Sequence, residues 1–203
     1  YKTVKGNEAM SLLEMAEIKG LSTGIVTTAR LTHATPAACY AHTASRDWEA
    51  DGDILRLSKE AHDAKFSDIA RQLIEFPYGD GLEVAMGGGR TKFLPKEIVD
   101  DEYENRNGER LDGRNLTKEW TSKYQNSAYV SDKQAFDAID AKKTKHLLGL
   151  FETSHMQYEF DRKADKKGEP SLSEMTSKAI DIVSKNRKGF FLMVEAGRID
   201  HAH

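Results

Sequence analysis

Acidic and imidazole side chains crowd together near the end of the sequence. Glu195, Asp200, His201 and His203 fall within nine positions, directly after the apolar run 190–194. An unbroken apolar run of this length is typical of a parallel strand that is covered on both faces. Because α/β proteins bind ligands and metals at the carboxyl ends of their strands, the sequence predicts a site here.

A second group of reactive side chains follows another short apolar stretch. His33 and Thr35 come soon after the β-branched segment 23–29, and Arg46 lies eleven residues beyond Thr35. If the two predicted strands are neighbours, one crevice would contain carboxylates, imidazoles, a hydroxyl and a guanidinium. That mixture suits divalent metals together with an anionic substrate.

The ligand types alone leave the metal open. Glu and Thr oxygens favour a hard ion such as magnesium, whereas Asp combined with His favours zinc. Each residue of the earlier group also fits a structural role: His33 as a hydrogen-bonded residue at a helix start, Thr35 as an N-cap, and Arg46 as a surface cation. For the acidic and imidazole cluster at the end, the alternative is a solvated loop.

Alternating helices and strands must position these side chains. Strands are predicted at 23–29, 82–86, 127–130, 147–151 and 190–194. Helices are predicted from Asn7 to Gly20, from Pro36 to about Arg46, from Ser67 to near Pro77, at 118–123, from Ser131 through Ile139, and from Ser171 to near Asn186. This order predicts an α/β fold with a mostly parallel sheet flanked by helices on both faces, in a single domain over residues 1–203.

Three polar stretches are predicted to lie between these elements. Residues 47–53 and 160–168 are expected to form loops, and residues 100–115 a surface excursion. The triplet Gly87–Gly89 is expected to be a tight turn rather than a phosphate loop, because it lacks the G-x-G-x-x-G spacing.

Composition excludes several classes of protein. The 203 residues carry a net charge of -3 without a basic block, which argues against nucleic-acid binding. No apolar run approaches the roughly 18 residues that a membrane-spanning helix needs. The single cysteine, Cys39, cannot form an internal disulfide and is interpreted as a small packed residue.

Several motifs in the same order resemble the alkaline phosphatase family. They are Ala-Thr-Pro-Ala-Ala (34–38) with Thr-Ala-Ser-Arg (43–46), Gly-Gly-Gly-Arg (87–90), Leu-Leu-Gly-Leu-Phe-Glu (147–152), Pro-Ser-Leu-Ser-Glu-Met-Thr (170–176) and the stretch 189–203. Together they span nearly the whole chain.

The resemblance implies a phosphomonoesterase that uses two zinc ions, one magnesium ion and a phosphoserine intermediate. Thr35 and Glu195 would be magnesium ligands and Asp200 a zinc ligand. Arg46 would clamp two phosphate oxygens, because its planar fork matches them. His33 and His201 stand where some family members carry aspartate and lysine, and would contact metal-bound water or the phosphate.

Other family features are missing from these 203 residues. No Asp-Ser-Ala type nucleophile motif occurs, nor the aspartate upstream of it, nor the later ligands that complete the zinc sites. The next zinc histidine would fall at position 204, and His203 matches the neighbouring position unless it substitutes as a zinc ligand. The chain is therefore interpreted as an internal segment of a larger alkaline-phosphatase domain, without detectable turnover in isolation.

A further cluster resembles an extra, calcium-binding site of animal relatives. Its members would be Glu102, the carbonyl of Phe151, Glu152 and Glu169, all oxygen ligands that fit calcium. A solvated acidic loop is the alternative interpretation.

The family also implies phosphate monoesters and inorganic phosphate as ligands, a homodimer, and a periplasmic or extracellular location. Two alternative functions remain: a phosphodiesterase or sulfatase of the same superfamily, and a metal-holding scaffold without catalysis.

Overall fold

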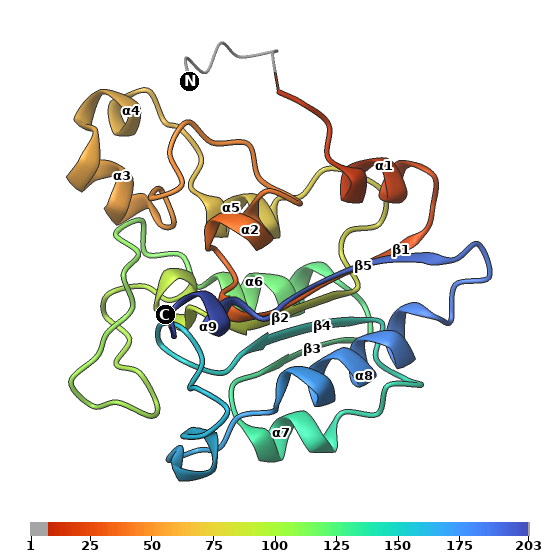
Figure 1. Cartoon of the computed structure of the whole chain (residues 1–203). Helices are drawn as coiled ribbons and strands as arrows, with labels where there is room; N and C mark the ends of the chain where they lie inside the picture. The colour runs from red at the N-terminus through yellow and green to blue at the C-terminus, as the bar shows by residue number, and fades with distance from the viewer. Residues whose placement is uncertain (1–7, 203) are drawn as a thin grey trace.

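A five-stranded parallel sheet forms the centre of the computed structural model, which describes residues 8–202 (Figure 1). The strands β1 (Ser22–Arg30), β2 (Val84–Gly88), β3 (Ser127–Val130), β4 (His146–Leu150) and β5 (Phe190–Glu195) are arranged in the order β3-β4-β2-β1-β5. All four pairings are parallel. The predicted fold class is therefore confirmed.

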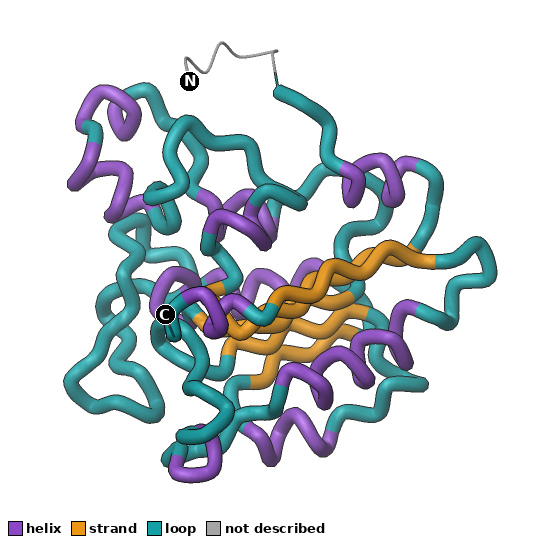
Figure 2. The backbone as a smooth tube through the Cα atoms, viewed as in Figure 1, coloured by secondary structure: helices purple, strands orange, loops and turns teal. Residues whose placement is uncertain are grey.

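Helices cover both faces of this sheet (Figure 2). Strand side chains alternate between the two faces because successive residues of a strand point to opposite sides. In β1, Ile25 packs into the core that lies against α1 (Leu12–Ile18), α5 (Ile69–Ile74) and α6 (Leu116–Lys123). Val26, its neighbour, packs instead against α8 (Leu172–Val183) and α7 (Lys133–Ala138).

Local capping explains where several helices begin. The Ser171 hydroxyl accepts a hydrogen bond from the Glu174 N–H while the Glu174 carboxylate accepts from the Ser171 N–H, as the sequence predicted. The first helix has the same arrangement at Ser11. The predicted cap Asn7 lies outside the described residues. The cap of α5 is Asp68 and not the predicted Ser67, since the Asp68 carboxylate accepts from the Arg71 N–H.

The predicted helix from Pro36 to Arg46 is wrong. The helix α2 covers only Ala34–Ala37, and the chain then becomes irregular. The Thr43 hydroxyl donates to the Ser45 carbonyl, and the Asp47 N–H donates to the Ser45 hydroxyl. Such local side-chain bonds compete with helix formation, so Arg46 is presented from a loop.

Two of the predicted polar loops contain more structure than expected. Residues 47–53 include the start of α3 (Asp51–Leu57), which is followed by α4 (Lys59–Asp63). The predicted surface excursion 100–115 carries buried charges, with Arg110 fully buried and Asp100 4% exposed. Arg110 pairs with Asp68 and Asp100 pairs with Arg90, so these ion pairs fix the stretch against other segments of the protein.

The remaining elements are short. They are the 3-10 turns η1 (Arg90–Phe93) and η2 (Arg162–Ala164) and the helix α9 (Gly197–Asp200). The predicted glycine turn is displaced: Gly87 and Gly88 belong to β2, and Gly89 makes the turn with a φ of 89°. Within residues 8–202, no helix is long and apolar enough to cross a membrane.

Candidate functional site at the carboxyl edge of the sheet

The carboxyl ends of β1 and β5 lie side by side. Thr27 of β1 is in register with Glu195 of β5, and the Thr27 hydroxyl donates a 2.6 Å hydrogen bond to Glu195 Oε2. The two groups of side chains that the sequence singled out therefore meet at one edge of the sheet, as the spacing argument requires.

Four predicted site residues lie around this edge. His33 is the residue before α2, and its Nε2 lies 3.0 Å from Arg46 Nη2. His201 follows α9, with its ring centroid 6.0 Å from that of His33. Arg46 is exposed, and the Glu195 carboxylate is close enough to oppose the lowering of the His33 pKa.

Two further residues of the prediction are more peripheral. Thr35 is exposed within α2, and Asp200 is exposed at the end of α9. His203 lies outside the described residues. The side chains of Thr35 and Asp200 are therefore accessible from solvent.

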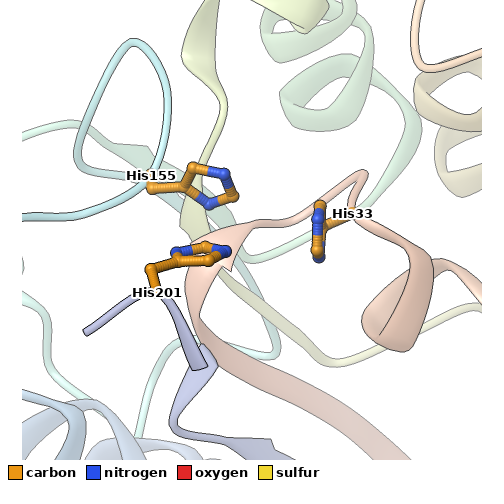
Figure 3. Close-up of side chains that lie close together, drawn as sticks. All are labelled: His33, His155 and His201. Atoms are coloured by element: carbon orange, nitrogen blue, oxygen red, sulfur yellow. The ribbon is translucent and has the colours of Figure 1, made fainter. Parts of the chain in front are cut away.

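A third histidine, His155, joins the site from the loop after β4. Its ring lies 5.2 Å from the ring of His33 and 4.4 Å from that of His201, measured between centroids (Figure 3). Sequence reasoning missed this residue. Its signal was available, since His155 follows the predicted strand 147–151 just as His33 follows 23–29.

Glycines allow the His155 loop to cross the strand ends. A Cβ on Gly88 would lie only 2.0 Å from the Ser154 carbonyl oxygen, and that same oxygen accepts a 2.7 Å hydrogen bond from the Gly89 N–H. The Met156 N–H then donates to the Thr28 carbonyl. The loop is therefore fixed on both sides of His155.

Burial and positive neighbours keep two of the imidazoles neutral. Desolvation, followed by the charges of Arg30 and Arg46, lowers the pKa of His33. Desolvation and Arg30 lower the pKa of His155 to about 3. A neutral imidazole can accept a hydrogen bond or bind a metal.

We call His33, Thr35, Arg46, His155, Glu195, Asp200 and His201 the carboxyl-edge site. A second cluster, the acid pocket, consists of Glu102, Glu152, Asp165 and Glu169. Three of its members, Glu102, Glu152 and Asp165, offer carboxylate oxygens that lie within 4.8 Å of one another. The structure thus brings predicted residues of this cluster together and adds Asp165, which the sequence analysis did not include.

The acid pocket has unsatisfied oxygens. Glu102 Oε1, Asp165 Oδ2 and Glu169 Oε2 are buried without a hydrogen-bond partner among residues 8–202. Desolvation and the neighbouring carboxylates raise the pKa of Glu169 to about 8 and also raise that of Glu102. The alternative interpretation of a solvated loop is wrong for Glu102, Glu152 and Glu169, which are at most 3% exposed.

Neighbouring side chains position this cluster. Arg90, which is 1% exposed, forms a bidentate ion pair with Asp100 and donates to Glu102 Oε2 at 3.0 Å. The Tyr103 hydroxyl donates to Glu152 Oε1 at 2.7 Å. The ring of Phe151 packs into the core against Phe136. Only the backbone carbonyl of Phe151 could therefore act as a metal ligand.

Comparison with known proteins agrees with this architecture. The family model for alkaline phosphatase matches residues 2–203. The chain belongs to the alkaline phosphatase family.

The tissue-nonspecific alkaline phosphatase of Felis catus is 47% identical over 207 residues, covering 99% of this chain and 38% of the relative. The chain therefore spans about two fifths of that enzyme's length. Thermus thermophilus alkaline phosphatase superposes with a TM-score of 0.69 at 33% identity, covering 94% of this chain and 32% of the other. A TAB5 alkaline phosphatase mutant, described with Mg bound in the M3 site, shares the fold at 22% identity and a TM-score of 0.59, covering 94% of this chain and 43% of that one.

Proposed function

We propose that this chain is a segment of an enzyme that hydrolyses phosphate monoesters. The observation that carries the proposal is the meeting of the β1 and β5 ends, which puts Arg46 and His33 beside Glu195 and His201 in a chain of the alkaline phosphatase family.

Arg46 would bind the phosphate. Its planar guanidinium can donate two parallel hydrogen bonds to phosphate oxygens, which a lysine ammonium cannot do. The side chain is exposed and contacts the His33 imidazole, a neutral partner that it can exchange for an anion without leaving a carboxylate unpaired.

The same edge offers oxygen ligands for metals. Thr35 and Glu195 would hold magnesium, and Asp200, with His203 as a second ligand, would hold zinc. The fit is supported by Glu195, whose Oε2 accepts from Thr27 and whose Oε1 remains for an ion. Bound ions would polarise the phosphate and lower the pKa of bound water.

His33 and His201 would orient the phosphate and the water around it. Their rings are held by arginines, with Arg46 at His33 Nε2 and Arg198 Nη1 at 3.3 Å from His201 Nδ1. These contacts restrain the two imidazoles at the edge where Arg46 would bind the substrate.

We also propose that the acid pocket binds calcium. Calcium takes six to eight oxygen ligands, including carboxylates and backbone carbonyls. Buried carboxylate oxygens without partners at Glu102 and Glu169, the neighbouring Glu152, and the carbonyl of Phe151 fit this chemistry.

In this proposal the reaction would proceed through a phosphoserine intermediate, and none of the serines of this chain matches the nucleophile motif of the family. In the same proposal the complete enzyme acts as a homodimer on phosphate monoesters, releases inorganic phosphate, and works in the periplasm or outside the cell.

The test compares the 203-residue chain with the complete polypeptide that contains it. We expect zinc- and magnesium-dependent release of p-nitrophenol from p-nitrophenyl phosphate by the complete polypeptide only. Arg46→Ala should lower kcat/KM by about 100-fold, as the loss of a transition-state donor does. The control Arg71→Ala removes a partly exposed arginine that pairs with Glu75 and should change little.

Two results would contradict the proposal. Turnover by the 203-residue chain alone would show that the resemblance has misplaced the nucleophile. Faster hydrolysis of a diester or a sulfate ester than of the monoester would favour another enzyme of the superfamily, and no hydrolysis by the complete polypeptide would favour a metal-holding scaffold.

A further inference from the structure

Three imidazoles from three separate segments converge at the carboxyl-edge site. His33 comes from the turn between β1 and α2, His155 from the loop after β4, and His201 from the residue that follows α9 (Figure 3). One nitrogen from each ring lies within 4.8 Å of the corresponding nitrogens of the other two. The function proposed above gives His155 no role.

The ring nitrogens are incompletely paired as they stand. His33 Nδ1 is buried without a hydrogen-bond partner in the part of the chain that the structure describes. Both nitrogens of His155 face hydrogen-bond donors of Arg30, the backbone N–H at 3.2 Å and Nη1 at 2.7 Å. A neutral imidazole can accept at only one nitrogen, so one of these two contacts is unsatisfied.

We propose that His33, His155 and His201 form a binding site for a borderline divalent transition ion such as Zn²⁺ or Co²⁺. Three imidazoles are a known ligand set for zinc, and a three-ligand site leaves the fourth tetrahedral position open. The site would be separate from the Thr35, Glu195 and Asp200 ligands assigned above, and it does not depend on phosphatase activity.

The three side chains need only a small approach to bind one ion. Zinc–nitrogen bonds of about 2.0–2.1 Å place the nitrogens of a tetrahedral site roughly 3.4 Å apart, so the nitrogens must approach by about 1.4 Å or less. The backbone already holds the three residues in place. The His33 carbonyl accepts from the Ala37 N–H, the His201 carbonyl accepts from the Tyr158 hydroxyl, and hydrogen bonds flank His155.

Three guanidinium groups near the proposed ion influence which ligand would occupy its fourth coordination position. Arg30 forms a bidentate ion pair with Glu49, so it can give up its contact with His155 without losing its charge partner. Arg46 and Arg198 each approach a ring of the cluster. Positive groups around the ion favour an anion in the open position, so phosphate should strengthen metal binding.

Cobalt is the probe for the test, because tetrahedral Co²⁺ absorbs in the visible. We expect the 203-residue chain to develop one equivalent of this absorption on titration with CoCl₂, and Zn²⁺ to displace it. Loss of partners that only orient a ligand weakens metal binding by about 10–100-fold, so loss of a direct ligand in His155→Ala should weaken it by at least about 100-fold.

The matched control is His62→Ala. His62 is a partly exposed imidazole of α4 that lies outside the cluster, so this variant should bind Co²⁺ like the original chain. His155→Asn serves as a second variant, because its amide can still accept from the Arg30 N–H. Unfolding in EDTA establishes that the variants are folded.

The cobalt titrations of the variants can overturn the proposal or reassign the ion to other ligands. Cobalt affinity that is unchanged in both His155 variants would overturn the proposal, and loss of binding in Asp200→Asn alone would assign the ion to the proposed zinc ligands instead. If the cobalt result holds but the complete polypeptide hydrolyses no phosphate ester, only the phosphatase proposal fails.

Discussion

Arg46 and Arg90 show how differently the two candidate metal regions are built. Arg46 is exposed at the carboxyl-edge site, where it contacts the neutral imidazole of His33. Arg90 is 1% exposed beside the acid pocket and binds Asp100 and Glu102. The same side-chain type is available to a ligand in one region and is committed to the fold in the other.

The difference extends to the metals that each region suits. The carboxyl-edge site combines neutral nitrogens with exposed oxygens and guanidiniums, whereas the acid pocket contains buried carboxylates with unpaired oxygens. Nitrogen ligands select borderline ions and clustered carboxylates select calcium. Because its charges are buried, the acid pocket should affect stability far more than the carboxyl-edge site does.

Loss of the buried arginine should have the largest effect. Arg90→Met leaves Asp100 and Glu102 buried without their cation, and breaking a buried pair in this way costs about 3–5 kcal/mol. Urea unfolding measures the loss. Lys59→Ala, which removes an exposed pair with Asp63, should cost under about 1 kcal/mol. Equal costs would show that the acid pocket is not held by Arg90.

Calcium should stabilise the chain through the acid pocket. At a free concentration 100 times the Kd, binding adds about 2.7 kcal/mol to the free energy of unfolding, seen as a higher Tm. Glu152→Gln should abolish this gain, while Glu159→Gln, an exposed carboxylate on the neighbouring loop, should retain it. An equal gain in the Glu152 variant would place calcium elsewhere.

Without metal, the acid pocket should make stability depend on pH. The pKa of Glu169 is about 8 in the folded chain against an ordinary value of 4.5, so the folded state holds a proton that the unfolded state releases. Stability should therefore fall as pH rises from about 4.5 to about 8.

Urea unfolding in EGTA at pH 5 and pH 8 tests this dependence. Glu169→Gln should reduce the loss of unfolding free energy between pH 5 and pH 8, because the amide stays neutral. Glu159→Gln should leave this loss unchanged. Part of the fall should remain, because burial raises the pKa of Glu17 to about 8 as well. If the Glu169 variant lost as much unfolding free energy between pH 5 and pH 8 as the original chain, Glu169 would not be the titrating group.

The smallest effect is expected for the exposed arginine. Arg46→Ala should change the free energy of unfolding by no more than about 0.5 kcal/mol, as surface substitutions usually do. Thermal and urea unfolding would measure it, alongside Arg90→Met. If Arg46→Ala lowered the free energy of unfolding nearly as much as Arg90→Met, Arg46 would be needed to stabilise the fold. The two arginines would then not differ in the way described above.

Much of the fold followed from local pattern. The apolar runs 23–29 and 190–194 predicted the strands β1 and β5, which the structure extends by a residue or two. The Ser171–Glu174 pair predicted the start of α8. The helix predicted over 36–46 failed because nearby hydroxyls bonded to the backbone there. The excursion 100–115 was misjudged because polar composition does not reveal a buried ion pair.

The sequence by itself determined the parallel α/β architecture, because the apolar runs of buried strands and the capping residues of helices are local features of the chain. It also placed reactive side chains after two strands. Only the tertiary structure decided that β1 and β5 are neighbours, that His155 joins His33 and His201, and that Arg110 is buried against Asp68. Those contacts join residues distant along the chain, and strand order and charge pairing arise only when the packed core brings the segments together.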